Sequence, residues 1–152
     1  MSTVTSVYLH PGQLFASTEP TVITTILGSC VGVCLWDPVL KAGALNHFLL
    51  PYGKGEGAAA LRFGNLSMEN LIRKMDLMGC SRENIQAKIF GGGCVIQAFR
   101  DEGQHLGLKN IEIAKKVLKE EKIRIAGEDV GGRNGRKLIF HTEDGTVWVK
   151  LL

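Results

Sequence analysis

A cysteine and a histidine form the pair of residues in this sequence that could carry out nucleophilic catalysis. Cys30 follows Gly28 and Ser29 at the abrupt end of an apolar, β-branched segment, where a side chain can be presented at an opening. A cysteine attacks a carbonyl carbon as the thiolate, so it needs a base nearby, and histidine titrates close to neutral pH. His47 lies 17 residues further on, inside the apolar segment 42–50. The pair predicts attack on an amide or ester carbonyl through a thioester.

This chemistry requires two further groups. An acceptor must fix the tautomer of the imidazole, and Thr24 and Thr25, just before the Gly-Ser turn, are the candidates. A hydroxyl orients an imidazole more weakly than a carboxylate, which suits a modest hydrolase. Backbone N–H groups at the turn formed by Gly28, Ser29 and Cys30 are the candidate oxyanion hole. If the chain were helical from residue 31 onward, the helix dipole would also favour the thiolate.

A purely structural role for these residues stays open, because most cysteines in a reduced domain pack as small apolar groups. The other cysteines, Cys34, Cys80 and Cys94, are predicted to be structural, since none combines a Gly-Ser turn with a nearby histidine. Their spacing does not provide the two close pairs that zinc sites use. We therefore expect no metal, no cofactor and no disulfide framework.

Composition limits the class of protein. The chain has 152 residues, of which 45% are hydrophobic and 22% charged, and its net charge is +3. These values predict one globular domain over residues 1–152, with too little positive charge to indicate nucleic-acid binding. No apolar run approaches the roughly 20 residues that span a bilayer, and the first residues lack the pattern of a signal peptide. We expect a cytoplasmic protein without membrane insertion.

The predicted elements are short strands and two helices. Apolar, alternating or β-branched segments predict strands at 7–9, 14–17, 21–26, 42–50, 86–90 and 123–126, and a hairpin of 136–142 with 146–151. Residues 31–36 fit either a strand or a short buried helix. Helices are expected from Ser67 to Met78, capped by Ser67, and over 111–121, capped by Asn110. Residues 52–65 predict a glycine-rich loop, and the whole pattern is typical of an α+β domain.

Two glycine clusters lack the surroundings of a phosphate-binding loop. Neither Gly91–Gly93 nor the stretch 130–135 is followed by the lysine and helix start that such loops need. Both predict tight turns with positive φ, or places where the backbone approaches another group closely. The nearby basic residues, Arg133, Arg136 and Lys137, predict a solvated rim or a contact with an acidic partner.

Several separated segments together resemble one known family. They read TTILGSCV (24–31), LNHFLLP (45–51), SMENLI (67–72), AKIFGG (87–92), DVGG (129–132) and GRK (135–137). This combination resembles CheD, the chemoreceptor glutamine deamidases of bacterial chemotaxis, over nearly the whole chain. One departure is Lys109-Asn110 before the second helix, where family members often carry Arg-Asn.

The resemblance implies a three-layer α/β/β sandwich and a defined set of roles. Cys30 would be the nucleophile, His47 the general base and acid, and Thr24 the residue that orients His47. The implied substrates are glutamines on methyl-accepting chemotaxis receptors, which become glutamate with release of ammonia. The implied partner is CheC, a phosphatase that acts on the phosphorylated regulator CheY.

Two alternatives remain beside this hypothesis. The protein could be a non-catalytic interaction module that binds CheC and receptors. It could also be a transglutaminase-like enzyme, which forms the same thioester but transfers it to an amine. The intact pair of Cys30 and His47 favours catalysis over the first alternative.

Overall fold

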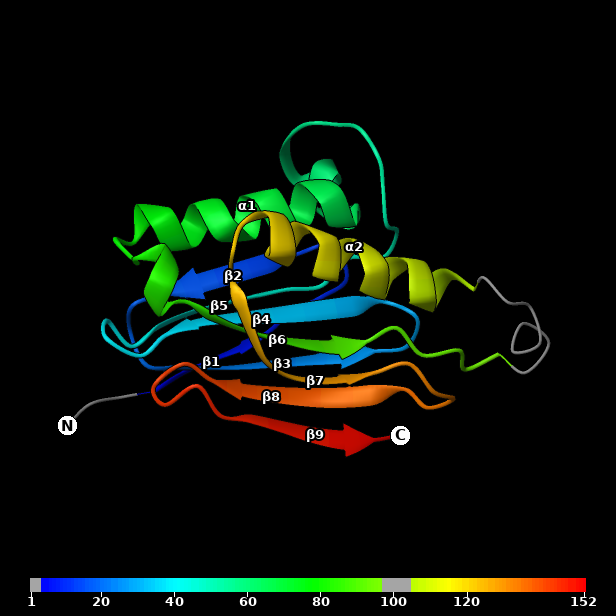
Figure 1. Cartoon of the computed structure of the whole chain (residues 1–152). Helices are drawn as coiled ribbons and strands as arrows, with labels where there is room; N and C mark the ends of the chain where they lie inside the picture. Colours follow the sequence, from blue (N-terminus) through cyan, green and yellow to red (C-terminus); the bar gives the residue numbers. More distant parts are fainter. Residues whose placement is uncertain (1–3, 97–104) are drawn as a thin grey trace.

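A computed structural model describes residues 4–96 and 105–152. Within these ranges two mixed β-sheets stack face to face, and two α-helices cover the outer face of one of them (Figure 1). The predicted α+β class and the three-layer α/β/β arrangement are confirmed.

The helix-covered sheet has five strands in the order β2 (Leu14–Ser17), β5 (Ala42–Asn46), β4 (Val31–Asp37), β6 (Gln86–Gly91) and β7 (Arg124–Val130). Only β6 and β7 pair in parallel. Helices α1 (Gly64–Leu77) and α2 (Leu106–Glu120) pack on one face through apolar residues at helical spacing. The opposite face of this sheet is therefore free to pack on the second sheet.

The second sheet has the order β1 (Thr5–Tyr8), β3 (Thr21–Leu27), β8 (Arg136–His141) and β9 (Val147–Leu151). Alternate residues of β3 are fully buried, because strand side chains point to opposite faces in turn. They meet a second apolar cluster between the sheets: Leu9, Ile23, Leu27, Cys34, Leu45, Phe90, Leu138 and Phe140. This inter-sheet layer is where the candidate site lies.

The segment that the sequence left ambiguous is a strand. β4 pairs with β5 on one side and with β6 on the other, so tertiary pairing decides its conformation. Cys30 therefore does not stand at the N-terminus of a helix formed by the residues that follow it.

Both helices begin earlier than predicted. α1 starts at Gly64, preceded by a short 3₁₀ helix (Gly57–Arg62) inside the predicted loop, and Ser67 is a buried helical residue instead of the cap. α2 starts at Leu106, with the His105 side chain accepting a hydrogen bond from the Leu108 N–H. Asn110 is thus not the cap of α2, and its amide has another use.

The first glycine cluster confirms the prediction of positive φ and close backbone approach. Gly91 and Gly92 have φ of 98° and 67°. A Cβ atom on Gly91 would overlap the carbonyl oxygen of Cys30, and one on Gly92 would overlap the side chain of Ile111. Glycine is needed here because the end of β6 lies directly against the turn that carries Cys30.

The prediction of a solvated rim is wrong for Arg136. Its guanidinium group is buried and donates hydrogen bonds to the carbonyl oxygens of Gly131 (2.7 Å), Asn134 (3.3 Å) and Gly91 (3.4 Å). It also pairs with Asp129 at 3.2 Å. Arg136 therefore connects the two glycine clusters from a buried position, because the donors of its planar guanidinium group reach several carbonyl oxygens at once.

Candidate active site

The turn formed by residues 28–30 links β3 of one sheet to β4 of the other, at the right-hand end of the sandwich in Figure 1. Cys30 is half-buried and packs against the apolar cluster between the sheets. The crossing from one sheet to the other therefore places the thiol at the open end of the inter-sheet layer.

Strand pairing brings Cys30 and His47 together. Val31 and Phe48 exchange two backbone hydrogen bonds of 3.1 and 3.0 Å, which continue the antiparallel register of β4 and β5. In this register His47 lies opposite Gly32, and Cys30 lies two residues along the strand from Gly32. The two side chains are thus diagonal neighbours on the face toward the second sheet, a separation of roughly 7–8 Å between Cα atoms.

A threonine hydroxyl fixes the tautomer of His47. The Nδ1 atom of His47 lies 2.7 Å from Oγ1 of Thr25, and that hydroxyl donates its one proton to the carbonyl oxygen of Leu9 at 2.8 Å. The hydroxyl must therefore accept from Nδ1–H. Nε2 keeps its lone pair, is buried and has no hydrogen-bond partner among the described residues. The arrangement thus places the proton on Nδ1 and leaves Nε2 able to accept one.

The contact to His47 comes from Thr25 and not, as predicted, from Thr24. Thr25 is fully buried between the sheets, whereas Thr24 is only partly buried. Neighbouring residues of a strand point to opposite faces, so only one of the two hydroxyls can face the imidazole. The phase of β3 assigns that position to Thr25.

Burial determines the resting protonation of the pair. Desolvation lowers the pKa of His47 to about 4. Desolvation also raises the pKa of the Cys30 thiol, an effect that its own backbone N–H partly offsets. At neutral pH the site therefore holds a neutral thiol and a neutral imidazole.

The buried imidazole should make stability depend on pH. Because the folded pKa of His47 is about 4 and the ordinary value is 6.5, the unfolded chain binds more protons between these pH values. His47 thus contributes stability that is complete above pH 6.5 and is lost as pH falls toward 4, about 3 kcal/mol in all. Urea unfolding over this range should show a much weaker pH dependence for His47→Gln. The exposed-residue variant His10→Gln is the control, and an unchanged slope in His47→Gln would contradict the assignment.

Two backbone hydrogen bonds from the segment after β6 hold the turn that is predicted to form the oxyanion hole. The carbonyl oxygen of Gly28 accepts from the N–H of Gly93 at 3.0 Å, and that of Cys30 accepts from the N–H of Gly92 at 2.9 Å. The turn is therefore tied to the end of β6. This explains why a glycine cluster without any phosphate-binding pattern lies beside the site.

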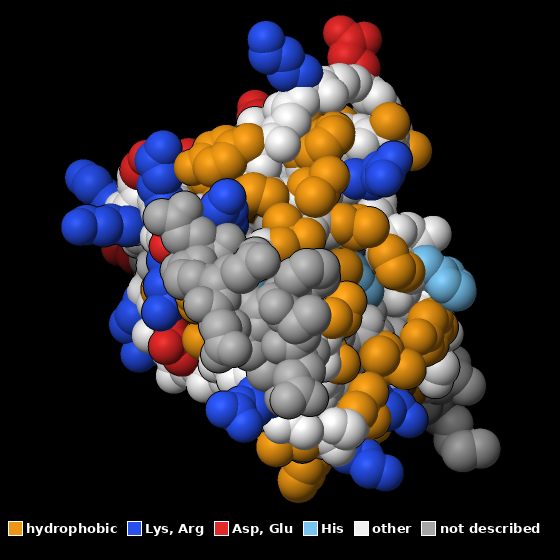
Figure 2. All heavy atoms as spheres, turned by 90° about the vertical axis from the view of Figure 1, so that its right-hand side faces the viewer, with side chains coloured by type: hydrophobic (Ala, Val, Ile, Leu, Met, Phe, Trp, Pro, Cys, Tyr) orange, Lys and Arg blue, Asp and Glu red, His pale blue; other side chains and the backbone are white. Residues whose placement is uncertain are grey.

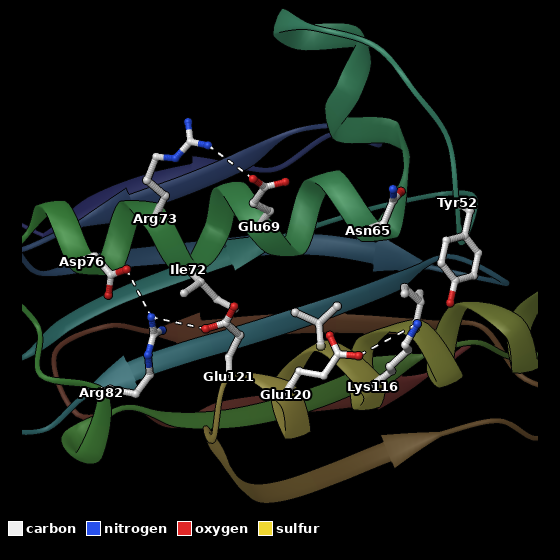
Figure 3. Close-up of a pocket in the computed structure, with 12 residues that line it drawn as sticks. Tyr52, Asn65, Glu69, Ile72, Arg73, Asp76, Arg82, Lys116, Glu120 and Glu121 are labelled. Atoms are coloured by element: carbon white, nitrogen blue, oxygen red, sulfur yellow. Dashed lines mark hydrogen bonds and ion pairs between the residues drawn. The ribbon is translucent and has the colours of Figure 1, made fainter.

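A groove of about 500 Å³ between α1 and α2 is a separate feature (Figure 3). Its charged residues pair with one another: Arg82 with Asp76 and Glu121 at 3.3 and 3.6 Å, and Lys116 with Glu120 at 3.9 Å. No cysteine, histidine, serine or threonine lines it. None of the predicted site residues is among the described residues that line the groove.

The surface around the candidate site is apolar. Figure 2 looks onto this end of the sandwich and shows hydrophobic side chains gathered on it, with Lys and Arg mainly at the margins. Exposed apolar residues come from the end of β3, the segment after β6 and the start of α2: Ile26, Val95, Ile96, Leu106 and Leu108. Large contiguous apolar patches can mark surfaces that bind other molecules.

Across residues 4–96 and 105–152, no three His, Cys, Asp or Glu side chains lie close enough together to hold a metal ion. No helix in the same ranges is long and apolar enough to cross a membrane.

Fold and site define a class: a small α/β/β sandwich with a cysteine, a histidine and a threonine hydroxyl gathered at one end of its inter-sheet layer. Comparison with known families makes the class specific. The profile described as "CheD chemotactic sensory transduction" matches residues 49–151, more than half of the chain. The chain belongs to the CheD family.

Relatives extend the similarity beyond the matched stretch. A protein of Anaeromyxobacter dehalogenans named probable chemoreceptor glutamine deamidase CheD 1 is 47% identical over 146 residues, covering 96% of this chain and 84% of its own. Proteins named probable chemoreceptor glutamine deamidase CheD from Sulfurimonas denitrificans and Trichlorobacter lovleyi are 41% and 40% identical. Their alignments cover 94% and 96% of this chain, and 92% and 90% of theirs.

Proposed function

We propose that the protein is a protein-glutamine deamidase that converts glutamine side chains of chemoreceptors to glutamate and releases ammonia. The names of the relatives support this reaction. The observation that carries it is the tautomer of His47. Its Nδ1 proton is held by Thr25, while Nε2 is buried without a hydrogen-bond partner in the described part of the chain. Glutamine hydrolysis requires a nucleophile and a base in this relation.

In the proposed first half-reaction, Sγ of Cys30 forms a bond to the carboxamide carbon of the glutamine, and the thiol proton passes to Nε2 of His47. The oxygen of the tetrahedral intermediate accepts hydrogen bonds from the backbone N–H groups of Ser29 and Cys30. The C–N bond then breaks. His47 returns the proton to the departing nitrogen, which leaves as ammonia, and a thioester on Cys30 remains.

In the second half-reaction, water replaces ammonia. Nε2 of His47 accepts a proton from the water as its oxygen bonds to the thioester carbon. Collapse of this intermediate breaks the C–S bond, and His47 returns the proton to the sulfur of Cys30. The products are glutamate and the regenerated thiol. The thiol, the imidazole and the backbone N–H groups fill every role in this sequence of steps.

The proposed substrates are methyl-accepting chemotaxis receptors, whose new glutamates can then be methylated. The apolar surface around the turn at residues 28–30 supports a protein substrate, because a small polar molecule would not require it. The proposed location is the cytoplasm, where the signalling part of such a receptor lies.

The Thr25 hydroxyl should matter for catalysis, whereas that of Thr24 should not. Thr25→Val keeps the shape but removes the acceptor for Nδ1–H, so part of the imidazole adopts the tautomer with its proton on Nε2. We expect kcat, measured as ammonia release, to fall by about 10²-fold. Thr25→Ser should restore most of the activity. Equal losses in Thr25→Val and the matched variant Thr24→Val would contradict the assignment.

Mass spectrometry of a receptor cytoplasmic fragment tests the proposed function. Wild-type protein should convert particular glutamines to glutamate, and Cys30→Ala should convert none. Glutamine–lysine crosslinks in place of glutamate would instead indicate a transglutaminase. An absence of any conversion by the wild type, with receptor still bound, would overturn the proposal in favour of a binding module.

We further propose a CheC-type phosphatase as a partner, supported by membership of the CheD family. Binding measured by calorimetry should be the same for wild type and Cys30→Ala, since the mutation removes only the nucleophilic sulfur. The absence of binding to a CheC protein would contradict this partnership without affecting the proposed reaction.

A further inference from the structure

Asn110 belongs to α2, outside the strands that flank Cys30 and His47, yet its side chain reaches the segments next to both. Its Nδ2 atom donates hydrogen bonds to the carbonyl oxygens of Ser29, at 3.0 Å, and Leu49, at 2.9 Å. Asn110 is fully buried. Ser29 directly precedes Cys30, and Leu49 follows His47 by two residues. One amide group therefore connects the two segments that carry the proposed nucleophile and base.

The bond to Ser29 fixes the direction of the N–H group of Cys30. The carbonyl of Ser29 and the N–H of Cys30 belong to the same planar trans peptide, so they point in opposite directions. When the carbonyl is held toward α2, the N–H faces away from α2. Among the described residues this N–H donates no hydrogen bond to another residue and acts on the sulfur of its own side chain, so the oxyanion can form beside it.

We propose that Asn110 is a positioning residue that orients the Ser29–Cys30 peptide so that its N–H can stabilise the oxyanion of the deamidation. This inference rests on the proposed function. The carbonyls of Gly28, Ser29 and Cys30 all accept hydrogen bonds, but the first and third are held by the backbone of Gly93 and Gly92. Only the middle peptide depends on a side chain, so a single substitution can release it.

Close packing places Asn110 within reach of the turn. A Cβ atom on Gly107, one helical turn before Asn110, would overlap the carbonyl group of Gly92. The start of α2 therefore lies against the end of β6 without intervening side chains. Because α2 begins at Leu106, the amide of Asn110 is not used to cap the helix.

The chemistry of the contact requires an amide donor. Nδ2 faces two carbonyl oxygens, while Oδ1 of Asn110 has no hydrogen-bond partner among the described residues. In Asn110→Asp a carboxylate oxygen would replace Nδ2 and repel both carbonyls. The side chain would keep its size but would no longer hold the peptide.

The test compares Asn110→Asp and Asn110→Ala with wild type in the full chain. We expect kcat for receptor-glutamine deamidation to fall by about 10²-fold, with KM changing less than about threefold. The rate at which iodoacetamide alkylates Cys30 should also stay within about threefold, because alkylation of a saturated carbon forms no oxyanion. The control is Asn65→Asp on α1, since the Asn65 side chain exchanges its hydrogen bonds with the backbone of Gly53 and makes none to the turn of residues 28–30 among the described residues.

Two results would overturn the inference. The first is an unchanged kcat in the Asn110 variants. The second is an equal loss of kcat and of alkylation rate, which would mean that Asn110 only supports the fold. If the buried carboxylate prevents Asn110→Asp from folding by urea titration, the uncharged Asn110→Ala decides between these results. A wild type without Cys30-dependent deamidation would overturn the proposed function itself. Wild-type activity with active Asn110 variants would overturn only the role of Asn110.

Discussion

Replacing Cys30 with alanine is expected to lower kcat for glutamine deamidation by at least about 10⁴-fold while leaving the protein folded. The side chain supplies the atom that forms the thioester, and nothing else at the turn of residues 28–30 offers a nucleophile of similar strength. Cys30 is half-buried at the end of the inter-sheet layer, so the smaller side chain removes little packing. The measurement is ammonia release together with the free energy of unfolding.

Cys34 provides the matched control. It lies on the same face of β4, but it is buried in the inter-sheet core, and burial raises the pKa of its thiol strongly. Cys34→Ala should therefore keep kcat within about threefold, because it lies outside the reacting groups. Retained activity in well-folded Cys30→Ala, or comparable losses in both variants, would contradict the assignment of the nucleophile.

Replacing His47 with glutamine is expected to lower kcat by about 10³-fold. The amide keeps a side chain of similar length at the buried position, but it cannot accept the thiol proton or return it to ammonia. Attack by Cys30 would then depend on the small fraction of thiolate, because burial raises the pKa of the thiol. His10→Gln, which changes an exposed histidine, should retain full activity.

The pH profile of the wild type should identify the same group. Because the pKa of His47 is lowered to about 4, kcat/KM should stay level from neutral pH down to about pH 5 and fall only as His47 takes up a proton. Because burial raises the pKa of Cys30, the thiol loses its proton only at a pH above the usual range for cysteine. An acid limb centred near the ordinary histidine value of 6.5 would contradict a buried, neutral imidazole.

The two further effects act through these groups. Thr25 holds the proton of Nδ1 and thereby leaves Nε2 free, and Asn110 holds the carbonyl of Ser29. Neither side chain needs to touch the substrate. Their variants should therefore lower kcat without abolishing the reactivity of the Cys30 thiol.

Local sequence determined the parts of this protein that depend on neighbouring residues. The sequence predicted the turn at Gly28, Ser29 and Cys30 and the strand that leads to it. It also predicted glycines with positive φ, because turn chemistry and alternation act over a few residues. The α+β class could be predicted for the same reason. The resemblance of separated segments then named the family, which the comparisons confirmed.

The tertiary structure alone decided which groups meet across the layers. The phase of β3 turned Thr25 and not Thr24 toward His47, and pairing on both sides made β4 a strand. Asn110 has the residue type of a helix cap, but packing extended α2 past it and turned its amide to the turn of residues 28–30. Burial, which lowers the pKa of His47, likewise arises only when two sheets close over the imidazole. These outcomes depend on contacts between residues far apart in the chain, and local propensity carries no information about them.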